Sequence, residues 1–249
     1  MNKHEDTFLK REELGSRIPK YQPTFNFQGE YIDEAHRYFA ECPVASGILV
    51  QVREPQTGSI IEGALRREDA LKLYEIGYCV SGDILELGCS HGLSTCILAQ
   101  ANSRSPVKKH IYTVDLNPAC VESTKQNLQK MGLANSVTAV CSDATAAVKK
   151  CADERKSFDF VFIDHTHAYE PVLAVCRVLR NIVSEGGFCL FHDFNDARNK
   201  DDKNPDYGVY TAVMDGLNQA DFEFYGVYGC TALYRKGQYD DVATPVAND

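Results

Sequence analysis

The chain has 249 residues, 44% of them hydrophobic, and a formal net charge of −9 at pH 7. This length and composition suit one large α/β domain with an extension, and the negative charge argues against sequence-independent binding to nucleic acid, which needs a basic face. Residues 1–6 are too charged for a signal peptide, and no apolar stretch is long enough to span a bilayer. We therefore expect neither a nucleic-acid nor a membrane partner.

The cysteines indicate a reducing compartment. The chain has ten of them, and no two form a Cys-x-x-Cys pair. Most lie in or beside apolar runs, where a reduced thiol acts as a small hydrophobic side chain. We expect a cytoplasmic protein with free thiols at Cys79, Cys89, Cys96, Cys141, Cys176 and Cys189.

Residues 1–62 are expected to form an N-terminal extension and cap. Residues 1–20 are polar and charged, whereas residues 21–60 contain several aromatic side chains and the apolar run 47–52. This second part is too hydrophobic for a linker and therefore predicts a docked cap. The cap either covers a substrate cleft or extends the core. Its aromatic side chains would also suit the interface of a homodimer.

A regular alternation of helical and strand patterns begins at Gly63. Apolar residues recur at helical spacing over residues 64–76. Downstream, short and almost continuously apolar runs alternate with helical patterns, which predicts a parallel sheet covered by helices on both faces. The predicted strands are 83–87, 110–115, 136–141, 158–163 and 187–192, and the predicted helices between them are 93–101, 118–131, 144–151 and 170–182.

The C-terminal part predicts the end of the sheet. A polar loop at 195–207 is followed by a helix near 209–219 and by two β runs, 222–228 and 230–235, joined around Gly229. The expected fold is therefore α/β, with a doubly wound, mostly parallel, seven-stranded sheet that ends in an antiparallel hairpin. We assign residues 63–237 to this domain and residues 238–249 to a disordered tail.

The first predicted strand runs into a glycine turn at a helix N-terminus. Such a turn presents backbone N–H groups to a ligand. A dinucleotide fingerprint would need glycines at the first, third and sixth positions of the turn, and these are Gly88, Ser90 and Leu93. Leu93 leaves no room for close helix–strand packing. A nicotinamide-dependent oxidoreductase is therefore a disfavoured alternative.

Acidic residues follow the next two strands. Asp115 ends the second strand, where a carboxylate can accept hydrogen bonds from both hydroxyls of a ribose. Asn117 is better placed than Asp115 to cap the helix that begins at Pro118, which leaves Asp115 for a ligand. Asp143 follows the third strand and either caps the helix that begins at Ala144 or faces a ligand, and one aspartate can do both.

The fourth and fifth strands end in ionisable residues. Burying such a group costs free energy unless it is paired or binds something, so a cluster beside the glycine turn indicates a functional site. A single histidine at this position would more often be structural. The cluster is expected to contain Asp164, His165, His167, His192 and Asp193.

The motifs in combination resemble those of class I S-adenosylmethionine-dependent methyltransferases, which have a Rossmann-like fold. Glu-x-Gly-x-x-x-Gly from Glu86, Asp-x-x-His-x-Tyr-Glu from Asp164, the Gly-Gly turn and the following His-Asp are similar to methyltransferase family 24, over about residues 63–235. The resemblance implies that S-adenosylmethionine is held by Glu86, Gly88, Ser90, Gly92, Ser94, Asp115, Asp143, Ala144 and Asp164, with Asp143 or its neighbour facing the adenine amino group.

The resemblance also implies a divalent cation at Asp164, His192 and Asp193. In related metal-dependent O-methyltransferases the positions of His192 and Asp193 carry acidic or amide residues, so His192 departs from that pattern. Mg²⁺ prefers oxygen ligands, whereas imidazole suits Mn²⁺, Fe²⁺ or Zn²⁺. Either the metal is softer, or no metal binds and His192 or His167 is the general base. His165 stands where the family commonly has glycine and adds another candidate catalytic imidazole.

The expected reaction is O-methylation of a small hydroxylated acceptor. The methyl group of a sulfonium is already activated, so the site needs only to align the acceptor and to remove its proton. A bound cation or a histidine base supplies that second function. N-methylation, the oxidoreductase and a non-catalytic cofactor-binding protein remain the alternatives.

Overall fold

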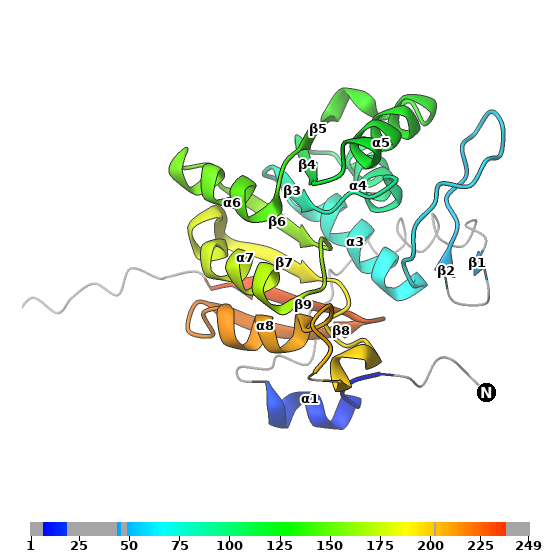
Figure 1. Cartoon of the computed structure of the whole chain (residues 1–249). Coiled ribbons are helices and arrows are strands. Elements are labelled where there is room, and N and C mark those ends of the chain that lie inside the picture. Colours follow the sequence, from blue (N-terminus) through cyan, green and yellow to red (C-terminus); the bar gives the residue numbers. More distant parts are fainter. Residues whose placement is uncertain (1–6, 19–43, 46–48, 202, 238–249) are drawn as a thin grey trace, which may run out of the picture.

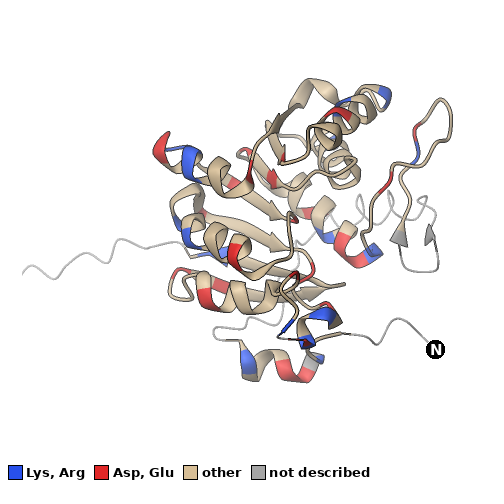
Figure 2. Ribbon diagram, in the orientation of Figure 1, with Lys and Arg blue, Asp and Glu red and all other residues tan. Residues whose placement is uncertain are grey.

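A computed structural model describes residues 7–18, 44–45, 49–201 and 203–237 (Figure 1). The aromatic segment 21–43 of the expected cap and the expected tail at 238–249 lie outside the described residues. Within them, no helix combines the length and the apolar character needed to cross a membrane. Lysines and arginines are spread over several helices in this part of the chain (Figure 2).

The predicted sheet is confirmed. It has seven strands in the order β5-β4-β3-β6-β7-β9-β8, and the first five of these pair in parallel. β9 pairs antiparallel with both β7 and β8, which gives the expected closing hairpin. The strands are β3 (Ile84–Leu87), β4 (Ile111–Asp115), β5 (Val137–Cys141), β6 (Phe158–Ile163), β7 (Val183–Phe191), β8 (Phe222–Tyr228) and β9 (Thr231–Lys236).

Helices cover both faces of the sheet, and each face has its own apolar core (Figure 1). One core includes residues of α6, α7 and α8, and the other includes residues of α3, α4 and α5. β6 shows why parallel strands read as continuous apolar runs: Val161 and Ile163 join the first core, while Phe160 and Phe162 join the second. The helices are α3 (Arg67–Cys79), α4 (Leu93–Arg104), α5 (Pro118–Lys130), α6 (Ala144–Asp153), α7 (Tyr169–Ile182) and α8 (Val209–Gly216).

β7 differs from the prediction, because it begins at Val183 rather than at residue 187. Phe158 pairs with Val183, and the register then shifts before Phe160 pairs with Phe188. The two glycines that indicated a turn therefore lie inside an irregular strand, and Gly186 adopts a positive φ of 73°. The Gly-Gly pair marks a bulge and not the start of the strand.

The N-terminal segment that the structure describes packs beside the loop after β7. It contains α1 (Arg11–Arg17), and its side chains of Leu9, Leu14 and Ile18 are buried in the same core as α7 and α8. The side chain of Asn195 accepts a hydrogen bond from the Leu9 N–H at 2.7 Å and donates one to the Leu9 carbonyl at 3.1 Å. This segment therefore holds the loop that leads away from Asp193. Two short strands, β1 (Val44–Ala45) and β2 (Leu49–Val50), form a separate antiparallel pair.

Candidate functional site

A cavity of about 480 Å³ lies at the carboxyl ends of the parallel strands. The chain order reverses between β3 and β6, which are neighbours in the sheet, and this switch point is where open α/β sheets bind ligands. The loops after β3, β4, β5, β6 and β7 all contribute to its lining. Of the predicted site residues, the lining includes Gly88, Ser90, Ser94, Asp115, Asp143, Ala144, Asp164, His165, His167, His192 and Asp193.

Two glycines shape the loop after β3. Gly88 has φ +95°, and a Cβ atom on it would lie 2.1 Å from the carbonyl oxygen of Asp164. Gly92 has φ +90° at the start of α4, where a Cβ atom would lie 3.0 Å from Thr124. Gly92 does not line the cavity, so its predicted role as a cofactor contact changes to that of shaping the loop. Only glycine meets both requirements, because other residues rarely adopt this backbone conformation.

Asp115 joins this loop to β4. Its Oδ2 accepts a hydrogen bond from the N–H of Ser90 at 2.9 Å, and its Oδ1 accepts one from the N–H of Asn117, also at 2.9 Å. Asn117 caps α5 by accepting a hydrogen bond from the N–H of Ala119, which confirms its predicted capping role. Asp115 is thus held in place at the cavity wall.

Asp143 has the capping role that was one of its two predicted roles. Its Oδ1 accepts a hydrogen bond from the N–H of Ala146 at 2.8 Å and caps α6. The residue also lines the cavity, together with Ala144. Capping therefore leaves Asp143 within reach of a ligand.

Glu86 lies behind the cavity lining and not in it. The residue is fully buried, and its Oε2 accepts hydrogen bonds from the hydroxyls of Thr95 at 2.5 Å and Thr113 at 2.6 Å. Its Oε1 has no hydrogen-bond partner. Burial raises the pKa of Glu86 to about 7 although these hydroxyls oppose the rise. We correct the expected direct contact with the cofactor: Glu86 joins β3 to α4 and β4 beneath the loop.

This raised pKa gives the protein an expected pH dependence. The folded protein binds the Glu86 proton more tightly than the unfolded chain, so the stabilisation is complete below pH 4.5 and is lost as the pH rises through about 7. The difference corresponds to about 3 kcal/mol. Glu86→Gln should therefore melt higher than the wild type at pH 8.5, but not at pH 4.5. Thermal melts in EDTA test this, and equal pH dependence in the two proteins would contradict it.

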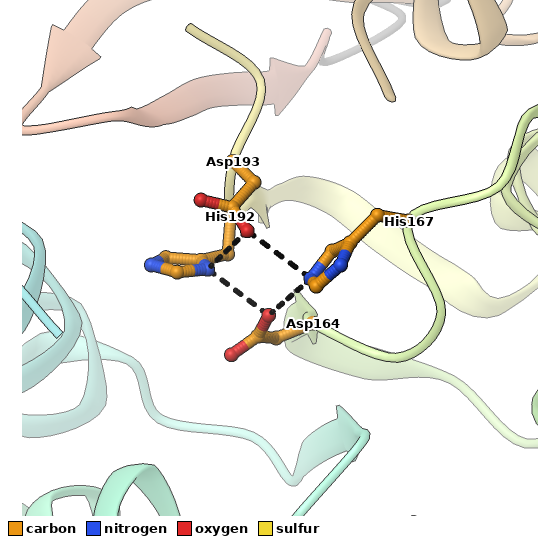
Figure 3. A group of neighbouring side chains, drawn as sticks. All are labelled: Asp164, His167, His192 and Asp193. Carbon is orange, nitrogen blue, oxygen red and sulfur yellow. Dashed lines mark hydrogen bonds and ion pairs between the residues drawn. The ribbon is translucent and has the colours of Figure 1, made fainter. Parts of the chain in front are cut away.

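Four of the predicted cluster residues converge (Figure 3). His192 Nδ1 lies 3.0 Å from Asp164 Oδ1 and 3.6 Å from Asp193 Oδ2. His167 Nε2 lies 3.1 Å from Asp193 Oδ2 and 3.7 Å from Asp164 Oδ1. One donor atom from each of the four residues thus lies within 4.8 Å of all the others. Asp164 follows β6 and His192 follows β7, as expected for strand ends that meet at one edge.

Asp164 and His192 favour their charged forms in this cluster. Burial opposes ionisation of Asp164, but the attraction of His192 and hydrogen bonds from both histidines outweigh it and lower its pKa to about 2. Burial likewise disfavours the charged form of His192, yet Asp164 raises its pKa well above the usual value. Without a cation, the imidazolium of His192 therefore balances the carboxylate of Asp164.

His165 differs from the other two histidines. It lines the cavity, but it does not share the donor group of Asp164 and His192. Its Nε2 is buried and has no hydrogen-bond partner, and burial lowers its pKa to about 4. The ring is therefore neutral at physiological pH.

Asp193 adopts an uncommon backbone conformation. Its φ of 59° lies in the left-handed region, where most residues with a side chain are strained. Asn199 supports this turn by donating a hydrogen bond to the Asp193 carbonyl at 2.9 Å. The turn directs the carboxylate of Asp193 back toward His167 and His192 (Figure 3).

Sequence reasoning missed two residues of the polar loop. Arg198 lines the cavity, and its guanidinium lies 4.2 Å from the ring centre of Tyr207. The ring of Tyr207 is 5.2 Å from that of His167 and so limits the position of this imidazole. Neither residue belongs to a periodic pattern or a spaced motif, so the sequence offered no signal for them.

The donor set fits a divalent cation. Two carboxylates and two imidazoles form an open group beside the cavity, and this mixture of oxygen and nitrogen ligands suits Mn²⁺ or Fe²⁺ better than Mg²⁺. The glycine loop fits a nucleoside-containing ligand, because its backbone closely approaches β6 and leaves the cavity free of side chains at Gly88.

Part of this chain is similar to known methyltransferases. The model of methyltransferase family 24, a methyltransferase domain, matches residues 85–194. The probable cobalt-precorrin-6B C(15)-methyltransferase (decarboxylating) of Methanobrevibacter smithii is 30% identical over 80 residues, which are 32% of this chain and 40% of that protein. The chain thus spans less than half the length of this relative.

Three solved structures share the fold. Cofactor-bound Rv0187 from MTB has a TM-score of 0.57 and 19% identity over 86% of this chain and 93% of its own. The O-methyltransferase TomG of Streptomyces achromogenes, in complex with SAM, has a TM-score of 0.52 and 18% identity over 85% of this chain and 91% of its own. An O-methyltransferase from Bacillus cereus, in complex with SAH, has a TM-score of 0.55 and 15% identity over 86% of this chain and 94% of its own.

Proposed function

We propose that this chain is a class I S-adenosylmethionine-dependent methyltransferase and that it transfers a methyl group to a hydroxyl of a small molecule; the match of residues 85–194 to methyltransferase family 24 supports the first part. One observation carries the proposal: the glycine loop and the four-residue cluster line the same cavity from opposite sides of the β3–β6 junction. The first suits the cofactor, and the second suits a hydroxyl that must lose its proton. The O-methyltransferases TomG and that of Bacillus cereus share this fold.

The loops after β3, β4 and β5 would hold the cofactor. Ser90 and Ser94 follow β3, Asp115 ends β4, and Asp143 and Ala144 follow β5; all five line the cavity. We assign the ribose hydroxyls to Asp115 and the adenine to Asp143 or the adjacent backbone. The several acids of the cavity favour a ligand with a positively charged sulfonium.

Asp164, His167, His192 and Asp193 would hold a divalent cation. A bound cation supplies Lewis-acid chemistry, which makes an acceptor hydroxyl easier to deprotonate. The two carboxylates provide the negative charge that such an ion requires, and the ring of Tyr207 limits the position of His167. Two imidazoles in the set favour Mn²⁺ or Fe²⁺ over Mg²⁺.

A metal-free reaction is the second candidate. His167 is partly exposed in the cavity, and its Nε2 lies 3.1 Å from Asp193 Oδ2. A carboxylate at this distance orients the imidazole, so the ring nitrogen that faces away from Asp193 would accept the proton of the acceptor hydroxyl directly. The oxidoreductase is less favoured, because Leu93 packs against Gly63 where a dinucleotide loop would have glycine.

Binding of the cofactor gives the direct test. We expect isothermal titration calorimetry to detect S-adenosylhomocysteine but not NAD⁺. Asp115→Ala should weaken this binding by about 1.5–3 kcal/mol, through lost charge-assisted hydrogen bonds and a less restrained Ser90. Asp153→Ala, at the exposed end of α6, is the matched control and should bind normally. Tight NAD⁺ binding would overturn the proposed function, and unchanged affinity in Asp115→Ala would overturn the ribose assignment.

A further inference from the structure

Two buried groups lie behind His192, on the side away from the cluster. The Nε2 atom of His192 is 3.6 Å from the Sγ of Cys230 and 3.9 Å from the Oδ2 of Asp69. All three residues are buried, with exposed fractions of 7%, 2% and 2% respectively. His192 is thus contacted on both ring nitrogens, by the cluster through Nδ1 and by this buried pair through Nε2.

Asp69 is firmly held in this position. It lies in the first turn of α3, and its Oδ1 accepts hydrogen bonds from the backbone N–H of Cys230 at 2.8 Å and from the N–H and hydroxyl of Thr231 at 3.1 and 2.7 Å. Its Oδ2 accepts one from the N–H of Arg66 at 3.0 Å. A Cβ atom on Gly229 would lie 2.4 Å from Asp69, so the hairpin closes directly on the carboxylate.

The thiol of Cys230 connects these groups. Its Sγ is 3.7 Å from Asp69 Oδ2 and 3.4 Å from Asp193 Oδ1, so the S–H can donate to either carboxylate. The sulfur can then accept the proton of His192 Nε2. Cys230 therefore contacts both the buried carboxylate and a residue of the cluster.

An imidazole can offer only one nitrogen lone pair, and the other nitrogen then carries the proton. In a buried site this N–H needs an acceptor, and such acceptors set the orientation of metal-binding histidines. We infer that Cys230 and Asp69 are positioning residues that hold the proton on Nε2 of His192, so that Nδ1 is the nitrogen that would offer its lone pair to a cation held with Asp164 and Asp193. The expected effect of this arrangement is tighter cation binding, and in that respect the inference rests on the proposed function.

The first test reads the proton itself and needs no metal. In protein labelled with ¹⁵N-histidine, the wild type should show a slowly exchanging ring N–H on Nε2 of His192, identified by its loss in His192→Ala. Cys230→Ala should lose this protection, whereas Cys230→Ser, which keeps a donor and acceptor, should retain part of it. A protected Nε2–H that is unchanged in both Cys230→Ala and Asp69→Asn would overturn the inference, as would a wild-type ring with no protected Nε2–H.

The second test measures metal binding by calorimetry with Mn²⁺ alone. Cys230→Ala and Asp69→Asn should each bind about 10–100-fold more weakly than the wild type, since removal of such supporting partners has this effect in other metal sites. Cys176→Ala, which removes another buried thiol on α7, should bind normally. Wild-type affinity in both Cys230→Ala and Asp69→Asn would overturn the inference.

The two tests separate the inference from the proposed function. If the wild type binds no divalent cation, the metal-dependent proposal fails. A protected Nε2–H that disappears in Cys230→Ala would then still support the positioning role. Circular dichroism checks that each variant is folded, and Asp69→Asn needs this check most because Asp69 also anchors the hairpin.

Discussion

Gly88→Val is expected to abolish S-adenosylmethionine binding, with a loss of affinity of at least ~100-fold. The added side chain would enter the cavity, and its Cβ would lie 2.1 Å from the Asp164 carbonyl oxygen and 2.7 Å from the Cα of His165. The φ of +95° adds strain, because residues with a Cβ rarely adopt it. Since the clash is with backbone, the end of β6 must also move, and we expect a lower melting temperature.

Gly132→Val provides the matched control for this prediction. Gly132 also has a positive φ, of +69°, but a Cβ there would meet no atom within 4 Å. This control therefore carries backbone strain without a clash or a change in the cavity, and it should bind S-adenosylhomocysteine as the wild type does. Calorimetry and thermal melts together compare the variants. A folded Gly88→Val protein with wild-type affinity would show that the loop does not hold the cofactor.

Asp164→Ala is expected to cause the largest loss in methyl transfer, on the order of 1,000-fold, if a cation is used. It removes the oxygen that lies 3.0 Å from His192 Nδ1 and leaves that buried imidazole without its nearest carboxylate. Mn²⁺ binding should be lost with it. In the same metal-dependent reaction, EDTA should abolish turnover, and Mn²⁺ should restore it at least as well as Mg²⁺.

The metal-free candidate predicts a different pattern for the same assays. EDTA should then have no effect, and His167→Ala should be the most damaging substitution, because it would remove the base itself. Turnover is followed as release of S-adenosylhomocysteine with a panel of hydroxylated small molecules. Asp201→Ala, an exposed residue of the polar loop, serves as the control. If neither chelation nor substitution of any cluster residue lowered turnover, the cluster would have a structural role only.

The sequence predicted the order and type of the main helices and strands in the domain, because the parallel strands are almost continuously apolar and the segments between them repeat their apolar residues at helical spacing. The cluster was predictable for a related reason. Asp164 and His192 directly follow adjacent strands, and the carboxyl ends of parallel strands meet at one edge. Side chains that directly follow a parallel strand can therefore be placed at the site from the sequence.

Contacts between distant segments could not be predicted in this way. Asp69 reaches Cys230 and Thr231 across more than 160 positions, and only the closure of the hairpin on α3 brings them together. Arg198 and Tyr207 come from a loop without periodicity. The role of Glu86 was misassigned because a sequence motif does not show whether an acid faces the cavity or the interior.

The left-handed backbone at Asp193 has a consequence for engineering this protein. A glycine at this position would relieve roughly 1 kcal/mol of strain, so a search for heat-resistant variants would tend to select it. That substitution would also remove the carboxylate that lies 3.1 Å from His167. Selection for stability alone would thus erode the proposed site, and any stabilisation programme should keep Asp193 constant while it varies residues far from the cavity.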